Sequence, residues 1–150
     1  MYSDVITVFN SYEDSFKNVT WYPSVIRGVN LLIDKSAIVA KYGAESKDNA
    51  ILNIRFDKVN EKIMVDGKNY LPPKEWERQT NDKLADSITF ASGTEFDFFM
   101  LGEYPEKEPI FDEKFRNGFF EEVKKEYDFV FAITSVGMYS VIPHFEITGK

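Results

Sequence analysis

The chain has 150 residues, of which 43% are hydrophobic and 29% charged, a size and balance that predict one globular domain over residues 1–150. The sequence contains no cysteine, which excludes a disulfide framework, a Cys-ligated zinc site and a thiol nucleophile. The formal net charge is −7 and the lysines are interleaved with acids, which argues against sequence-specific binding of nucleic acid, because such proteins usually present a basic face.

The beginning of the chain, MYSDVITVFN, has neither the basic start nor the long apolar run of a signal peptide. No apolar stretch approaches the ~20 residues that are needed to cross a bilayer. We therefore expect a protein that is made in the cytosol and has no membrane partner.

Three strands are predicted within the first 56 residues of the chain. Residues 5–12 begin with alternating β-forming residues, and residues 21–34 form a second extended segment. Pro23 and Gly28 interrupt that second segment, so we expect a bend, a bulge or an edge position there. Residues 51–56, ILNIRF, alternate as the next strand.

The segment 35–49 separates two of these strands and is longer than a hairpin requires. It reads KSAIVAKYGAESKDN, with too few alternating apolar residues for a strand and with lysines and acids close together. Loops of this length are usually either functional or disordered. We predict a long protruding loop over about 35–49.

A hairpin and several short elements follow. Residues 63–70, IMVDGKNY, predict a tight hairpin, because the glycine of Asp66-Gly67 tolerates a positive φ. Pro72-Pro73 ends its second strand, and the following KEWERQ is expected to form one or two helical turns. Residues 87–90 and 96–104 are predicted as short strands joined by a turn.

One longer helix is predicted over about 111–126. Apolar residues recur at every fourth position, namely Phe111, Phe115, Phe119, Val123 and Tyr127. Asp112 is the expected N-cap. The polar face carries acids as well as bases, which favours packing of this helix on a sheet over binding at a membrane surface.

The chain ends with two predicted strands, 129–136 and 138–147, that meet near Gly137. Many short strands and one helix predict a mainly β (α+β) fold, a small antiparallel β-barrel or sandwich with the helix packed outside it.

No site of chemistry is predicted. The one histidine, His144, has no assignable catalytic or metal-binding partner and is expected to be a structural or interface residue. Asp97 lies between Phe96 and Phe98, so we expect it on a solvated strand face opposite the aromatic rings. No glycine-rich phosphate loop and no GxSxG motif occurs. No catalytic, cofactor-binding or metal residue is therefore assigned, and an enzyme is not expected.

The order of these features resembles the head–tail connector proteins of long-tailed bacteriophages and prophages, which are also called head-closure, stopper or minor capsid proteins. The stretches that carry this resemblance cover most of the chain: DVITVFNSYED, TWYPSVIRGV, KYGAESKDNAILNIRF, YLPPKEW, SITFASGTEFDFFMLGEY and FAITSVGMYSVIPHFEITGK. They are strand and turn patterns rather than chemical motifs.

The resemblance implies a β-barrel with an attached helix and one long protruding loop. Copies would form a homo-oligomeric ring in the neck of the virion, between the portal or adaptor ring and the tail. That ring would close the DNA channel and dock the tail, and the genome would pass nearby without sequence-specific binding. A role as a tail-terminator or tail-completion protein and a stand-alone barrel that binds a small ligand remain the alternatives.

Seven residues are candidates for contacts with neighbouring subunits: Lys41, Tyr42, Gly43, Ala44, Glu45, Trp76 and His144. Tyr42 is the expected anchor in a neighbour, because tyrosine offers a large contact area at a low entropy cost. The alternative for the loop is an ordinary surface connection, and the alternative for Trp76 is a core anchor.

Overall fold

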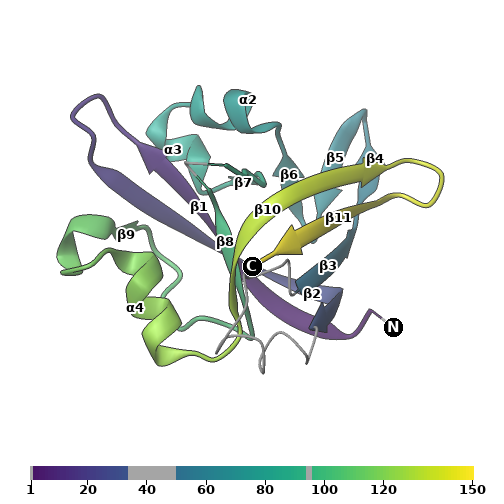
Figure 1. The fold of residues 1–150 in the computed structure, drawn as a ribbon. Coiled ribbons are helices and arrows are strands. Elements are labelled where there is room, and N and C mark those ends of the chain that lie inside the picture. Colours follow the sequence, from purple (N-terminus) through teal and green to yellow (C-terminus); the bar gives the residue numbers. More distant parts are fainter. Residues whose placement is uncertain (1, 34–49, 94–95) are drawn as a thin grey trace.

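The computed structural model describes residues 2–33, 50–93 and 96–150. The larger of its two sheets runs in the order β1 (Asp4–Glu13), β8 (Phe98–Leu101), β10 (Val130–Tyr139), β11 (His144–Gly149), β3 (Ala50–Arg55), β2 (Val19–Ile33) and β9 (Ile110–Phe111). Because β1 also pairs with β2, the first six strands of this order close into an antiparallel barrel, and β9 is an extra strand on β2 (Figure 1). The predicted small antiparallel barrel is confirmed.

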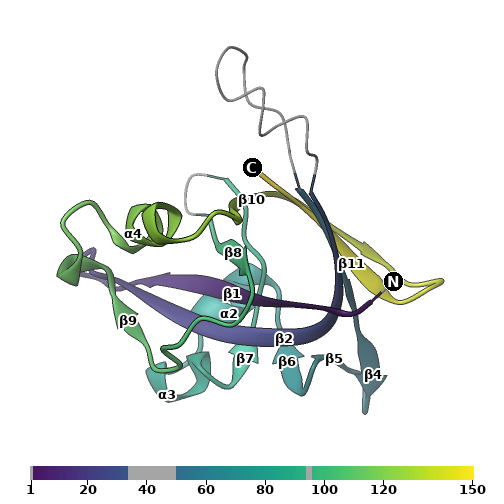
Figure 2. The ribbon, with the colours of Figure 1, turned by 90° about the horizontal axis from the view of Figure 1, so that it is seen from below.

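The barrel closes because β2 turns a corner. Its first part pairs with β1, and its last four residues pair with β3 (Figure 2). The register with β1 shifts at this corner, where Val5 faces Arg27 but Asp4 faces Val29. Gly28 is the extra residue and has a φ of +71°, a conformation that glycine adopts without strain. Of the bend, bulge or edge position expected around Pro23 and Gly28, the structure shows a bulge at Gly28.

The smaller sheet consists of β4 (Asp57–Val59), β5 (Lys62–Val65), β6 (Lys68–Tyr70) and β7 (Ser87–Ile88). The predicted hairpin is present between β5 and β6, with positive φ values of 45° at Asp66 and 87° at Gly67. Two short helices, α2 (Pro73–Glu77) and α3 (Asn81–Leu84), connect β6 to β7. Pro73 begins α2, as expected for a proline in the first helical turn.

Alternation along the strands gives the barrel an inner and an outer cluster, and Tyr22, Trp76 and Leu84 form a third cluster at α2 and α3. The inner cluster fills the barrel with residues from all six of its strands, among them Ile6, Ile26, Leu52, Phe99, Phe131 and Phe145. The outer cluster lies between the barrel and α4 (Phe119–Glu126) and comprises Phe9, Trp21, Phe98, Met100, Ile110, Phe119 and Val123. Neighbours in sequence such as Phe98 and Phe99 therefore belong to different clusters, as the period of a strand requires.

The helix predicted over about 111–126 begins later than expected. Phe111 is in β9, where it pairs with Thr20, and a short 3₁₀ helix, η1 (Asp112–Lys114), follows. The α-helix starts only after Gly118, whose φ is +88°. Asp112 still caps it from a distance, since its Oδ1 accepts hydrogen bonds from the backbone N–H of Phe119 at 2.8 Å and from Trp21 Nε1 at 2.9 Å.

The packing predicted for this helix is confirmed over its true length. Phe119 and Val123 are fully buried against the outside of the barrel, and Phe115 packs partly buried beside them. None of the helices in the described part of the chain is long and apolar enough to span a membrane.

The turn between the last two strands also lies later in the chain than predicted. Gly137 lies inside β10, where it pairs with Glu146, and the turn to β11 comes after Tyr139. The predicted protruding loop at 35–49 lies outside the described residues.

Candidate functional site

A buried carboxylate, Asp97, joins two parts of the barrel that are distant in sequence. Its side chain is 1% exposed. Oδ2 accepts hydrogen bonds from Asn10 Nδ2 and from the backbone N–H of Ala91, each at 2.9 Å. Oδ1 accepts from the backbone N–H of Ser11 at 2.9 Å and from Ser11 Oγ at 3.3 Å. The carboxylate thus ties β1 to the segment that precedes β8.

The solvated position expected for Asp97 is wrong. Alternation does place it on the strand face opposite Phe98, but that face points toward the barrel interior rather than toward water. Burial raises the pKa of Asp97 to about 7, whereas the hydrogen bonds from Ser11, Asn10 and Ala91 act in the opposite direction. Because four donors already surround the carboxylate, we assign it a structural role beneath the pocket described next.

A pocket of about 490 Å³ lies beside Asp97, between β1, β2 and α2. This volume is in the range of small-ligand sites, roughly 300–1,000 Å³. Both tryptophans of the chain line it, Trp21 and Trp76, together with the half-buried ring of Phe96. Three further acids also line it, namely Glu13, Asp14 and Glu77. The pocket therefore combines an aromatic floor with a negatively charged wall.

Two buried polar atoms on residues of this pocket have no hydrogen-bond partner within the described part of the chain. They are Nε1 of Trp76 and Oγ1 of Thr89, and both side chains are almost completely buried. Buried polar groups are normally paired, so each of these atoms leaves a hydrogen bond unmade. Among the described residues, no group of three or more His, Cys, Asp or Glu side chains could hold a metal ion.

A second feature is the tip of the β10–β11 hairpin, which projects away from the barrel (Figure 1). Four apolar side chains are exposed there, Met138, Tyr139, Val141 and Ile142, and the exposed fractions of the last two are 96% and 73%. Beside them the ring of His144 stacks on Tyr139 at 5.0 Å, and its Nδ1 lies 2.6 Å from the carbonyl oxygen of Ile142. The tip is therefore an apolar surface held in shape by its own contacts.

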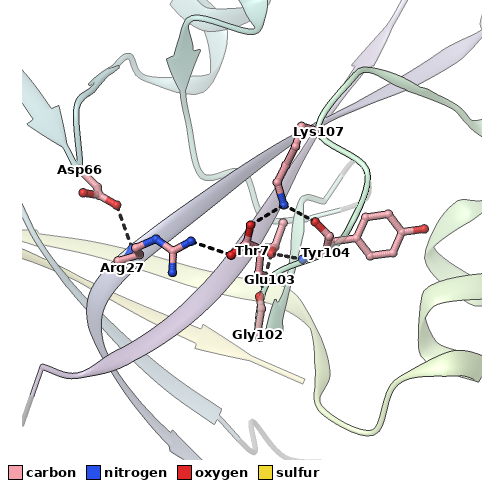
Figure 3. A network of polar contacts seen from close by, with 7 residues as sticks. All are labelled: Thr7, Arg27, Asp66, Gly102, Glu103, Tyr104 and Lys107. Carbon is pink, nitrogen blue, oxygen red and sulfur yellow. Dashed lines mark hydrogen bonds and ion pairs between the residues drawn. The ribbon is translucent and has the colours of Figure 1, made fainter.

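A third feature is a polar network on the outside of the barrel (Figure 3). Glu103 pairs with Arg27 at 2.6 Å and with Lys107 at 2.8 Å, and the hydrogen bonds from Lys107 and Arg27 lower its pKa. The backbone N–H of Arg27 donates to Asp66 Oδ2 at 2.9 Å. Thr7 Oγ1 donates to the carbonyl of Gly102 at 2.8 Å. These contacts join β1, β2, the β5–β6 turn and the segment after β8, although exposed ion pairs contribute little stability.

The seven residues predicted for interfaces are placed as follows. Lys41, Tyr42, Gly43, Ala44 and Glu45 lie outside the described residues. Trp76 is 1% exposed and packs edge-on against Tyr22 at 5.8 Å. It is therefore a core anchor, which was the alternative expectation for this residue, rather than a surface contact. His144 is half-buried at the base of the exposed hairpin tip.

Sequence reasoning missed both the pocket and the role of Asp97. The partners of this carboxylate lie up to 87 residues away, and no local pattern brings them together. The one signal in the sequence was the acid enclosed by aromatic residues in FDFF, which we assigned to a solvated face.

No curated protein and no solved structure matches the chain. The model of one family, described as a family of unknown function (DUF6751), matches residues 1–150. Because this match spans all 150 residues, the chain belongs to the family DUF6751.

Proposed function

We propose that the protein is a structural component of the neck of a long-tailed bacteriophage, where copies form a ring between the portal or adaptor ring and the tail. The ring closes the DNA channel and docks the tail, and the protein performs no chemistry. The support comes from the stretches of sequence that resemble head–tail connectors and from a barrel that carries a projecting apolar hairpin.

The observation that carries the proposal is the tip of the β10–β11 hairpin. Val141 and Ile142 expose 96% and 73% of their surface at its end, next to Met138 and Tyr139. Contiguous apolar surface of this kind is typical of a site that another protein covers. We assign the tip to a contact with a neighbouring ring or subunit.

The closed barrel explains why such a contact needs a projecting element. Each of the six barrel strands pairs with two other strands of the barrel. A neighbour cannot extend them by adding a strand, which is a common mode of assembly for open sheets. Contacts made by the six barrel strands then depend on hairpins and loops that leave the barrel, whereas β9 and the smaller sheet keep open edges.

The negative net charge of the chain is consistent with a ring that surrounds DNA without binding it. Its formal net charge of −7 has the sign of the phosphate backbone, so a ring of such subunits repels the genome rather than gripping it. The genome can therefore pass without sequence-specific contacts.

Two alternatives lead to other expectations. A tail-terminator or tail-completion protein would belong to the same particle but would stay with the tail when heads and tails are separated. A stand-alone barrel that binds a small ligand is favoured by the pocket of about 490 Å³.

Deletion of the gene from the phage or prophage genome that carries it tests the proposal. Electron microscopy of the particles should show heads without tails, or heads that have lost their DNA, and a plasmid copy of the gene should restore tailed particles. Normal numbers of tailed, infectious particles from the deletion strain would overturn the proposal.

A further inference from the structure

We propose that the pocket between β1, β2 and α2 binds an alkylguanidinium group, the group at the end of an arginine side chain. This inference is independent of the proposed role in a virion. It concerns the Trp21–Trp76 pocket, by which we mean the cavity of about 490 Å³ that both tryptophans line.

The charge of the pocket selects for a cation. Glu13, Asp14 and Glu77 line it, and the residues that line it in the described part of the chain include no lysine or arginine. Glu13 and Glu77 are exposed, so they can reach a ligand at the mouth. Asp14 is held in place, because its Oδ1 accepts hydrogen bonds from the backbone N–H groups of Phe16 and Asn18, each at 2.9 Å. An anion would meet only repulsion here.

The aromatic side of the pocket favours a flat cation over a compact one. A guanidinium stacks on aromatic rings and is more weakly hydrated than an ammonium, so it loses less on entering an apolar site. The floor is rigid: Trp21 Nε1 donates to Asp112 Oδ1 at 2.9 Å, and the ring of Trp21 packs edge-on against Phe98 at 5.0 Å. The ring of Trp76 packs edge-on against Tyr22 at 5.8 Å. The two tryptophan rings are therefore held in fixed positions beside the pocket.

Two further polar atoms belong to residues that line the pocket. Among the described residues, Oγ1 of Thr89 has no partner, and it would accept an N–H from a guanidinium if a side-chain movement exposed it. Nε1 of Trp76 likewise has no partner among the described residues and can only donate, so after such a movement it suits a carbonyl oxygen of the same ligand. An arginine within a peptide offers both a guanidinium and amide carbonyls. A free guanidine compound such as agmatine offers a guanidinium and an ammonium but no amide carbonyl.

Binding in the pocket can be measured by tryptophan fluorescence. The chain has two tryptophans and both line the pocket, so intrinsic fluorescence reports directly on its occupancy. The purified full chain is titrated with N-acetyl-argininamide and, separately, with N-acetyl-citrullinamide, which has nearly the same shape but no charge. We expect a saturable change in fluorescence with the arginine compound and none with the citrulline compound. Equal titration curves for the two would overturn the proposal.

Charge variants test whether binding occurs at this site. The double variant Glu13→Gln, Glu77→Gln should weaken binding of N-acetyl-argininamide by roughly tenfold, because it removes two of the charges that attract the ligand. The matched control is Glu75→Gln, which changes an exposed acid of α2 that does not line the pocket and should alter the affinity less than about twofold. Unchanged affinity in the double variant, or an equal loss in the control, would contradict the site.

Agmatine separates the two sources of the group. Saturable binding of agmatine supports a pocket for free guanidine compounds. Binding of N-acetyl-argininamide without binding of agmatine supports an arginine presented by another polypeptide. Both results support the shared chemistry, and neither depends on how phage particles assemble.

Discussion

Nδ2 of Asn10 donates a hydrogen bond of 2.9 Å to Oδ2 of Asp97, although the two residues lie 87 positions apart in the chain. The same amide group also donates to the carbonyl of Thr89 at 2.6 Å. A single pair of buried side chains thus holds the start of the barrel against the segment that enters β8. Buried polar contacts of this kind strongly constrain a fold, because leaving one partner unpaired is costly.

Asp97 should make the stability of the protein depend on pH. Its pKa is raised to about 7 in the folded state by burial, from about 3.9 in an unfolded chain. The folded state therefore binds the proton more tightly, so the stabilisation is fully present below pH 4 and is lost as the pH rises through about 7. We expect the free energy of unfolding of the wild type, relative to that of Asp97→Asn, to fall between pH 5 and pH 8.

Urea unfolding across this pH range is the appropriate measurement, with Asp128→Asn as an exposed control that should follow the wild type at every pH. The comparison with a variant isolates the contribution of this one carboxyl group. A constant difference between the wild type and Asp97→Asn would contradict the prediction.

Phe119→Ala should destabilise the protein by about 3–5 kcal/mol. The ring is fully buried and packs against Phe9 at 5.3 Å and against Phe98 at 5.9 Å, so its removal leaves a cavity in the outer cluster. Phe111→Ala is the matched control, because that ring is 47% exposed and its loss should have a much smaller effect. Equal shifts in the midpoint of chemical denaturation for the two variants would show that the face of α4 is not buried in solution.

Asp112→Ala should cost about 2–4 kcal/mol, because it removes the cap of α4 and also leaves the indole N–H of Trp21 unpaired. Asp112→Asn keeps one acceptor oxygen and should recover part of this loss. Denaturation curves of the two variants provide the test. Identical stability of Asp112→Ala and the wild type would mean that the cap contributes nothing.

The isolated protein should be a monomer or a weak oligomer, and the ring should form only within the particle. The net charge of −7 makes identical subunits repel each other, and the apolar tip of the hairpin is a small contact by itself. Light scattering of the purified protein at micromolar concentration and moderate salt would measure its mass. A stable ring of many subunits in isolation is the opposite result.

Local signals in the sequence predicted much of the fold. Asp66-Gly67 and Pro73 mark a turn and a helix start whose backbone conformations depend on a few adjacent residues, and Gly28 marks the bulge that lets β2 turn. The predicted start of the helix at about residue 111 was wrong, because Phe111 pairs with Thr20, a residue far away in the chain. Apolar residues at positions 111 and 115 have the spacing of a helix in the sequence, but the α-helix begins only after Gly118.

The candidate site could not be predicted in the same way. The pocket is assembled from β1, β2, α2 and the segment around Asp97, so its residues converge only once the barrel has closed. The turn of the β10–β11 hairpin was expected near Gly137, but that glycine pairs with Glu146 inside the ladder. The exposure of Val141 and Ile142 follows from that shifted turn and was therefore also missed.

The central claim, that the β10–β11 tip makes the contacts of a neck protein, is tested most directly by complementation. A phage or prophage that lacks this gene is supplied with the double variant Val141→Ser, Ile142→Ser, and with Val59→Ser as a control that changes an apolar side chain 53% exposed on β4. Because both sites are exposed, both proteins should fold with unchanged denaturation midpoints. We expect the control to restore tailed, infectious particles and the tip variant to leave heads without tails in electron micrographs. Normal numbers of tailed, infectious particles with the tip variant would contradict the account.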